Sequence, residues 1–177
     1  MLTTFIVAQL VGILAMLVGV VAYRQTNEAR MHLLIGVIVS LWAISNLLIE
    51  AYTGALMCML AALRQWGVLW LETASFKDKR RAAHAFSLVA TVFLVFTWQG
   101  WSSLLPYTSA LGLAYASYHL TGINLRKSLA LNEVIWGIHG LLFMSPLIVI
   151  NALVNLWVLL THMNKAPGYK SINSTNP

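Results

Sequence analysis

Two ionisable side chains, Arg64 and Glu133, stand inside long apolar runs of the chain. If these runs cross a membrane, each charge costs about 2.5 to 3.5 kcal/mol on insertion scales, so it should face protein or water and take a partner. With a helical rise of about 1.5 Å per residue, the two side chains lie at depths that a long Arg side chain can bridge. We therefore predict an ion pair or gate formed by Arg64 and Glu133. Two alternatives stay open: Arg64 extends toward the headgroups, or it contacts a solute.

Amide, hydroxyl and aromatic side chains recur at spacings of three and four in three other stretches, which places them on one face of a helix. The groups are Trp42, Ser45 and Asn46, then Asn132, Trp136 and His139, then Asn151 and Asn155. Indole rings can stack on a solute, and amides or imidazole can hydrogen-bond to it. We predict that a small polar solute binds to Trp42, Asn46, Trp136, His139, Asn151 and Asn155. The alternative is that these groups join packed helices, at about 0.6 kcal/mol for each hydrogen bond.

Enzymatic chemistry finds little support in the residue pattern. No nucleophile and base stand at a recognisable spacing, and no cluster has the spacing of metal ligands. Glu133 and His139 are six residues apart, so a helix turns them about 240° from one another. We expect no enzyme activity, no metal and no cofactor.

Composition predicts an integral membrane protein built from helices. Of 177 residues, 59% are apolar and 9% are charged, whereas soluble domains have roughly a quarter charged. Open strands cannot satisfy their backbone in lipid, so the spans should be α-helices. The net charge of +6 is divided among short loops, which disfavours nucleic acid as a partner. The single cysteine, Cys58, cannot form an internal disulfide.

Seven apolar segments are long enough to cross a bilayer, which needs on the order of 20 residues. The expected spans are Thr3 to Ala22, Met31 to Glu50, Thr53 to Thr73, Ala82 to Trp98, Ser102 to His119, Lys127 to Phe143 and Ser145 to His162. The fourth, at about 17 residues, is the weakest, because it is near the lower limit for a crossing. We expect one membrane domain over residues 1–163, a first segment that is retained rather than cleaved, and a disordered cytoplasmic tail over residues 164–177.

Basic residues occupy every second gap between these segments. They are Arg24 and Arg30, then Lys77, Lys79, Arg80 and Arg81, then Arg126 and Lys127, then Lys165 and Lys170 in the tail. The other gaps carry none, and Arg64 is the one exception to the pattern. Short loops rich in Lys and Arg stay on the cytoplasmic side of a membrane. The alternation predicts seven spans, with the N-terminus outside and the C-terminus inside.

A weak internal repeat relates the two ends of the chain. Tyr23 and Trp42 match Tyr118 and Trp136 at spacings of 95 and 94. Chance similarity between apolar helices is the alternative, but repeats are common in transporters. The two copies run in the same direction, because one span separates them. We predict a three-plus-one-plus-three plan with repeat one over residues 3–73, a linker helix over 82–98 and repeat two over 102–162.

Four stretches carry a family resemblance: QLVGILAMLVGVVAYRQTNEARMHLL, GALMCMLAALRQ, LLP at residues 104–106, and WGIHG at residues 136–140. Together they resemble the YgjV-like bacterial inner-membrane proteins, which implies a multi-pass protein of that membrane. At the level of architecture, the plan is similar to that of the SWEET, PQ-loop and nicotinamide riboside carriers. The chain departs from the PQ-loop pattern, because no Pro-Gln pair ends either leading helix.

These observations favour a small-solute transporter or facilitator that works by alternating access. Its partners would be the lipid bilayer and a small polar solute. Assembly into a homo-oligomer is an open alternative. The alternative is a non-transporting membrane protein that assembles with a protein or lipid partner. The residues do not specify the solute.

Overall fold

The computed structural model describes residues 2–98, 100–142 and 144–163 of the chain. Within these residues it contains α-helices, one short 3₁₀ helix and no strand, as the sequence predicts. The helices are α1 (Leu2–Tyr23), α2 (Glu28–Leu48), α3 (Tyr52–Trp70), α4 (Phe76–Phe96), η1 (Trp101–Ser103), α5 (Leu104–His119), α6 (Gly122–Leu142) and α7 (Pro146–His162). The tail expected to be disordered, residues 164–177, lies outside the described residues.

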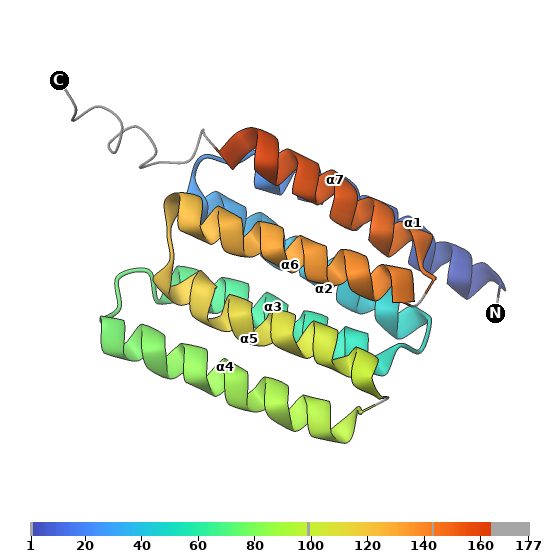
Figure 1. Cartoon of the computed structure of the whole chain (residues 1–177), viewed down its shortest axis with the longest axis horizontal. Coiled ribbons are helices and arrows are strands. Elements are labelled where there is room, and N and C mark those ends of the chain that lie inside the picture. The colour runs from blue at the N-terminus through green and yellow to red at the C-terminus, as the bar shows by residue number, and fades with distance from the viewer. Residues whose placement is uncertain (1, 99, 143, 164–177) are drawn as a thin grey trace.

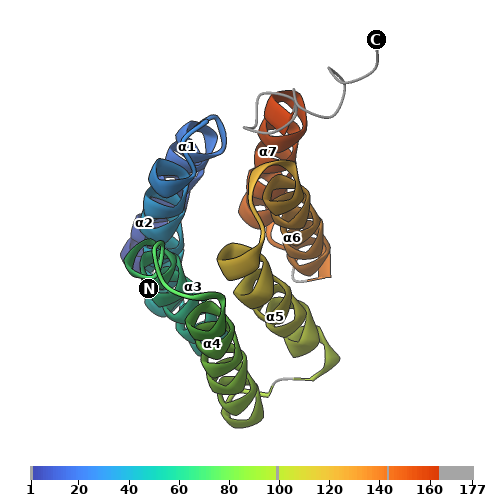
Figure 2. The same cartoon turned by 90° about the vertical axis from the view of Figure 1, so that its left-hand side faces the viewer.

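The helices form two layers, and neighbours in sequence run antiparallel (Figure 1). In one layer α2 packs against both α1 and α3, and in the other α6 packs against both α5 and α7. Helix α1 contacts α7, and α3 contacts α5, so the layers meet at both sides of the bundle (Figure 2). Helix α4 follows α3 and packs on α5 and α3 at one edge. We call α1 to α3 the N-terminal triplet and α5 to α7 the C-terminal triplet.

Most helix ends agree with the predicted segments within three residues, but two helices begin earlier. Helix α4 begins at Phe76 rather than Ala82, and α6 begins at Gly122 rather than Lys127. Hydropathy marks only the apolar part of a helix, whereas a helix begins at its cap. Ser75 supplies that cap for α4, because its Oγ accepts a hydrogen bond from the Asp78 backbone N–H at 3.2 Å. The fourth segment is therefore a helix of 21 residues, longer than its apolar stretch indicated.

Helix α1 shows how small residues position the layers. A buried stripe of small side chains repeats at spacings of four and three; its members are Ala8, Gly12, Ala15, Gly19 and Ala22. Such stripes allow close approach of neighbouring helices in membranes. The opposite face exposes large apolar side chains, among them Leu10, Leu14 and Leu17. This face suits contact with lipid tails.

The two tight hairpins, α2–α3 and α6–α7, close with the same turn. Glu50 and Met144 both adopt positive φ, at 60° and 49°. In the first turn Ala51 N–H donates to Asn46 O at 2.9 Å, and in the second Ser145 N–H donates to Gly140 O at 2.9 Å. This bond, with a left-handed residue before it, is the Schellman ending of a helix. Each residue of the first turn lies 94 positions before its counterpart in the second.

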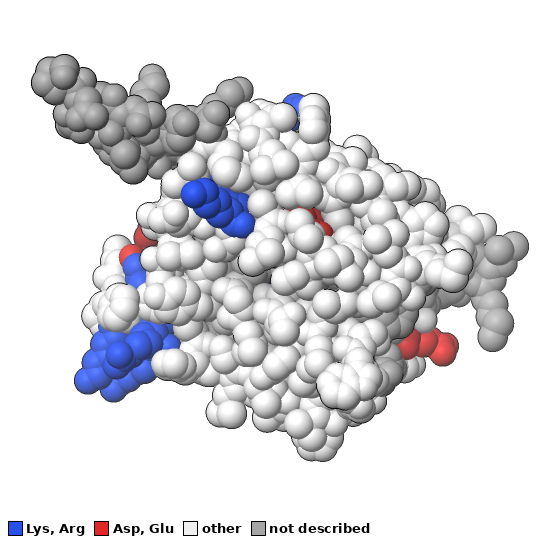
Figure 3. All heavy atoms as spheres, in the orientation of Figure 1, with Lys and Arg blue, Asp and Glu red and all other residues white. Residues whose placement is uncertain are grey.

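The turns that carry basic residues lie at one end of the bundle (Figure 1). These are the α1–α2, α3–α4 and α5–α6 turns, and the largest group of Lys and Arg lies over the α3–α4 turn (Figure 3). We call this end the basic end. By length and composition alone, two helices among the described residues qualify as membrane spans: Thr3–Tyr23, with mean hydropathy 2.6, and Glu28–Leu48, with 1.9. Helix α7 is a shorter apolar helix.

Candidate functional site

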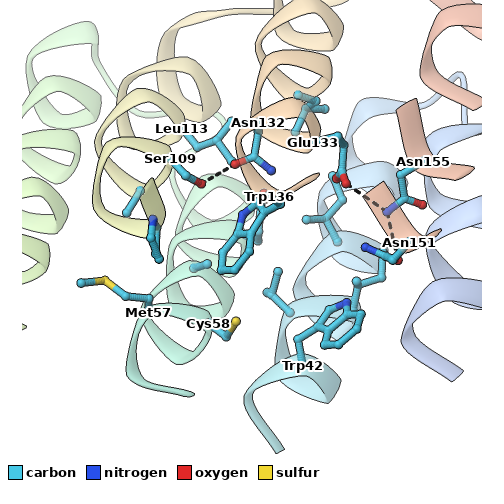
Figure 4. A pocket seen from close by; sticks show the side chains of 18 of the residues that line it. Trp42, Met57, Cys58, Ser109, Leu113, Asn132, Glu133, Trp136, Asn151 and Asn155 are labelled. Atoms are coloured by element: carbon cyan, nitrogen blue, oxygen red, sulfur yellow. Dashed lines mark hydrogen bonds between the residues drawn. The ribbon is translucent and has the colours of Figure 1, made fainter. Parts of the chain in front are cut away.

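A cavity of about 90 Å³ lies between the two triplets. Helices α2 and α6 face each other across it, while α1, α3, α5 and α7 complete the wall. Many side chains around it are apolar, but polar ones come from all six helices (Figure 4). The polar lining residues are Tyr23, Asn46, Arg64, Gln65, Ser109, Asn132, Glu133, Asn151 and Asn155. The cavity therefore has a mainly apolar surface, into which polar groups from every wall are set.

The structure brings most of the predicted site residues together. The residues that line the cavity are Trp42, Asn46, Arg64, Glu133, Trp136, Asn151 and Asn155. His139 lies outside the lining; its ring contacts that of Trp136 edge-on, with 5.4 Å between centroids. Ser45 was grouped with Trp42, but its hydroxyl donates to Ala8 O at 2.9 Å and joins α2 to α1. It is thus a packing residue in this structure.

Glu133 lies at the centre of a buried hydrogen-bond chain. The Tyr23 hydroxyl donates to its Oε1 at 2.8 Å, and Asn155 Nδ2 donates to its Oε2 at 3.4 Å. Asn155 Nδ2 also lies 3.3 Å from Asn151 Oδ1, so two acceptors set the orientation of this amide. The chain joins α1, α6 and α7 and holds the carboxylate in place. Figure 4 shows the part of it that runs from Glu133 through Asn155 to Asn151.

Arg64 is buried in the same cavity wall but does not pair with Glu133. Its side chain is 4% exposed, and Nη1 donates to Ala110 O at 3.4 Å. Its Nε is buried without a hydrogen bond to any residue that the structure describes. Within those residues, no ion pair joins Arg64 to Glu133, so the structure differs from the predicted pair. The hydrogen bonds that Glu133 makes go to Tyr23 and Asn155 instead.

Other polar lining residues were not among the predicted site residues. Ser109 donates to Asn132 Oδ1 across α5 and α6, and Gln65 Oε1 contacts His32 Nδ1 at 2.6 Å. Asn132 was grouped with Trp136 by its helical spacing, but it was left out of the predicted solute contacts. Ser109 and Gln65 have no polar residue beside them at spacing three or four that would mark a face, so only the packing of helices reveals them.

The two facing helices line the cavity in the same register. On α2 the lining residues include Ile35, Ile38, Val39 and Trp42; on α6 they are Leu129, Asn132, Glu133 and Trp136. Each residue of the first set is 94 positions before its counterpart (35 and 129, 38 and 132, 39 and 133, 42 and 136). The two walls differ in chemistry, because Ile38 and Val39 are apolar where Asn132 and Glu133 are polar. The site is thus built on equivalent positions but is asymmetric.

The family comparison agrees with this membrane-type architecture. The model of the Imp-YgjV family, described as bacterial inner membrane protein, matches residues 6–166. This chain belongs to the Imp-YgjV family. The predicted resemblance to YgjV-like proteins is confirmed, and so is the predicted location in the bacterial inner membrane. Comparison with curated proteins and with solved structures gives no match.

In a bacterial inner membrane protein, a polar cavity between helices has two kinds of use. Its groups can satisfy one another and hold the helices together, as Tyr23, Glu133 and Asn155 do here. They can also bind a solute or ion, since ionisable groups at membrane depth mark such paths. Among the residues that the structure describes, Arg64 makes one long hydrogen bond through Nη1, and its buried Nε makes none.

The triplets are joined by hydrogen bonds at the basic end. Glu28 Oε1 accepts from the Gly122 backbone N–H at 2.5 Å, which connects the start of α2 to the start of α6. Arg126 donates to Tyr23 O at 3.1 Å and to Gln25 O at 2.5 Å. A carboxylate at a helix N-terminus is also favoured by the helix dipole. These contacts hold the two triplets together between the cavity and this end.

Proposed function

We propose that the protein is a small-solute carrier or facilitator of the bacterial inner membrane. The observation that carries the proposal is the polar cavity between two helix triplets, lined by Arg64 and Glu133. Transporters place their solute sites near the bilayer midplane, at the interface between structural repeats. A cavity in this position can become accessible from either side when the triplets rock against each other.

The proposal includes seven membrane spans arranged as two parallel repeats around α4. Two independent features support the repeat at a spacing of 94. Four lining positions of α2 match four of α6, and the two hairpin turns share their left-handed residue, Glu50 or Met144. In architecture, this three-plus-one-plus-three plan is similar to that of the SWEET carriers.

The basic end should face the cytoplasm, with the N-terminus outside and the C-terminus inside. Loops rich in Lys and Arg remain on that side during insertion. The contacts of Glu28 and Arg126 with the opposite triplet would then close the cavity toward the cytoplasm. In the transport cycle these contacts would break as the inner side opens.

Within the cavity, we assign solute contact to a set of side chains from α2, α6 and α7. They are Trp42, Asn46, Trp136, Asn151 and Asn155. His139 would act through Trp136, whose ring it contacts. Arg64 and Glu133 would bind charged parts of the solute and couple it to the closure of the inner side.

The test is uptake by vesicles that contain the purified protein, screened with a panel of radiolabelled metabolites. Trp136→Ala and Asn151→Ala should abolish the uptake that the unchanged protein supports. The matched controls are Trp157→Ala and Asn124→Ala, because both side chains are exposed and away from the cavity. Retained uptake in the first two variants would remove these residues from the site. No uptake above empty vesicles for any solute would overturn the carrier function.

The alternative is a non-transporting membrane protein that assembles with a protein or lipid partner. It is favoured by polar groups that are used in packing, such as Ser45 with Ala8 and Thr53 with Thr97. A cysteine at position 151, in a Cys58→Ser background, distinguishes the two. Labelling by a soluble thiol reagent from one side of the membrane supports the carrier, whereas protection from both sides supports the alternative.

A further inference from the structure

Charges of opposite sign stand in different layers around the cavity. Arg64 belongs to α3 in the N-terminal triplet, and Glu133 belongs to α6 in the C-terminal triplet. Both line the cavity, and both are at least 95% buried. The two residues therefore border the same space without neutralising each other through an ion pair among the described residues.

Arg64 has hydrogen-bond donors that lack acceptors among the described residues. A guanidinium has five N–H donors and no acceptor. Here Nη1 has one long hydrogen bond to Ala110 O, at 3.4 Å, and the buried Nε has none to the described residues. A buried cation without a counter-charge is strongly unfavourable. Its planar fork matches a carboxylate, which it can bind through two parallel hydrogen bonds.

Glu133 offers the complementary charge. An ionised carboxylate has about four acceptor sites. Tyr23 and Asn155 supply two donors, which leaves room for further N–H donors from an occupant of the cavity. The indoles of Trp42 and Trp136 line the same space, and the face of an indole attracts a cation. This part of the site therefore suits an ammonium group.

The size of the cavity limits the occupant. A void of roughly 150 Å³ holds one benzene ring. A cavity of about 90 Å³ is smaller, and at the same volume per atom it holds about four heavy atoms. Glycine is the amino acid nearest to this size, and it carries both charges.

We infer that the cavity binds a small zwitterion, whose carboxylate contacts Arg64 and whose ammonium group contacts Glu133. The inference deepens the proposed function by naming the solute class, and it rests on the same site. A monovalent anion would neutralise Arg64 but leave Glu133 without a counter-charge. A monovalent cation would do the reverse, and a neutral solute would leave both charges unmatched.

Thermal unfolding of the full chain in detergent tests the charge requirement. The probes are glycine and β-alanine as zwitterions, acetate as the anion, methylammonium as the cation and acetamide as the neutral analogue. Glycine or β-alanine should raise the Tm by at least about 3 °C at saturation, and the other probes by less at equal concentration. Equal shifts for acetate and glycine, or no shift for either zwitterion, would overturn the inference.

Two variants assign the charges to the two ends of the probe. Arg64→Gln should remove the response to acetate and weaken that to glycine, but keep the response to methylammonium. Glu133→Gln should do the opposite. A residue with only a structural role would not produce such a reversal of preference. Arg30→Gln and Glu72→Gln are the charge-matched controls, because both side chains are exposed, and they should respond as the unchanged protein does.

Arg64→Lys keeps the test decisive if Arg64→Gln does not fold. It keeps the positive charge, so the preference for glycine over methylammonium should survive, and loss of that preference in folded protein would count against the inference. The outcomes also separate binding from transport. Glycine binding, together with no uptake of any solute by vesicles, leaves the inference intact and defeats the carrier. Uptake of a neutral solute, without glycine binding, supports the carrier and defeats the inference.

Discussion

The Tyr23 hydroxyl donates a hydrogen bond of 2.8 Å to Glu133 Oε1, across 110 positions of sequence. Both side chains are buried, at 4% and 5% exposure. The bond joins α1 to α6, and through Asn155 it extends to α7. It therefore ties the two triplets together at the side of the cavity nearest the basic end.

Tyr23→Phe tests the energetic weight of this bond. The ring remains, but a buried carboxylate loses a donor, which costs about 1 to 3 kcal/mol. We expect the Tm in detergent to fall by several degrees. Tyr52→Phe is the control, because Tyr52 is 56% exposed, and it should leave the Tm unchanged. An equal Tm for both variants would contradict a stabilising role for the bond.

Gly19→Ala tests the close approach of α1 to α7. A Cβ at this position would lie 2.8 Å from Asn155 Oδ1, so the amide that donates to Glu133 would have to shift. Such overpacking costs about 1 to 3 kcal/mol. Gly112→Ala is the matched control, since a Cβ there meets nothing within 4 Å, and it should be neutral or slightly stabilising. Equilibrium unfolding of both variants measures the difference.

Arg64→Met separates a structural role from a functional one. Removing one partner of a buried ion pair costs about 3 to 5 kcal/mol, whereas replacing an unpaired buried charge with an apolar side chain is neutral or stabilising. Because Arg64 has no ion-pair partner among the described residues, we expect unchanged or increased stability together with loss of uptake. A Tm decrease of about 6 °C or more would point to a structural partner instead.

Glu28→Ala tests the closure at the basic end. The variant loses the hydrogen bond to the Gly122 backbone N–H. A loss of about 1 kcal/mol should shift the ratio of open to closed states by about fivefold. We expect faster thiol labelling of Asn155→Cys, in a Cys58→Ser background, from the cytoplasmic side. Glu72→Ala, an exposed acidic residue outside the cavity, should leave the labelling rate unchanged.

The orientation of the chain can be measured with reporter fusions. Alkaline phosphatase, which is active outside the cytoplasm, should be active when it is fused within residues 50–52 and inactive when it is fused within residues 73–75. Only the second site lies in a turn at the basic end, which we expect to face the cytoplasm. Green fluorescent protein at the C-terminus should fluoresce in cells. The reverse pattern would show that the basic end faces outward.

Several features of the fold could be predicted from short-range information. Apolar runs locate the helices, because a helix that crosses the lipid needs a long apolar stretch. Lys and Arg in alternate gaps predict that every second turn lies at the same end of the bundle. Helix beginnings were harder to predict, because caps such as Ser75 stand outside the apolar run. Spacings of three and four identified Trp42, Trp136 and Asn155 as cavity residues, since a helical face follows from sequence distance alone.

The helices, the common end of the basic turns and the helix faces that carry polar groups therefore follow from the sequence alone. The tertiary structure decided which groups meet. In the folded chain Ser45 donates a hydrogen bond to the Ala8 carbonyl oxygen. Glu133 accepts hydrogen bonds from Tyr23 and Asn155 and, within the part of the chain that the structure describes, forms no ion pair with Arg64. The physical reason is that a face specifies a direction on one helix, whereas a partner depends on the rotation and distance of another helix. Small residues such as Gly19 set that distance, by allowing α1 to approach Asn155.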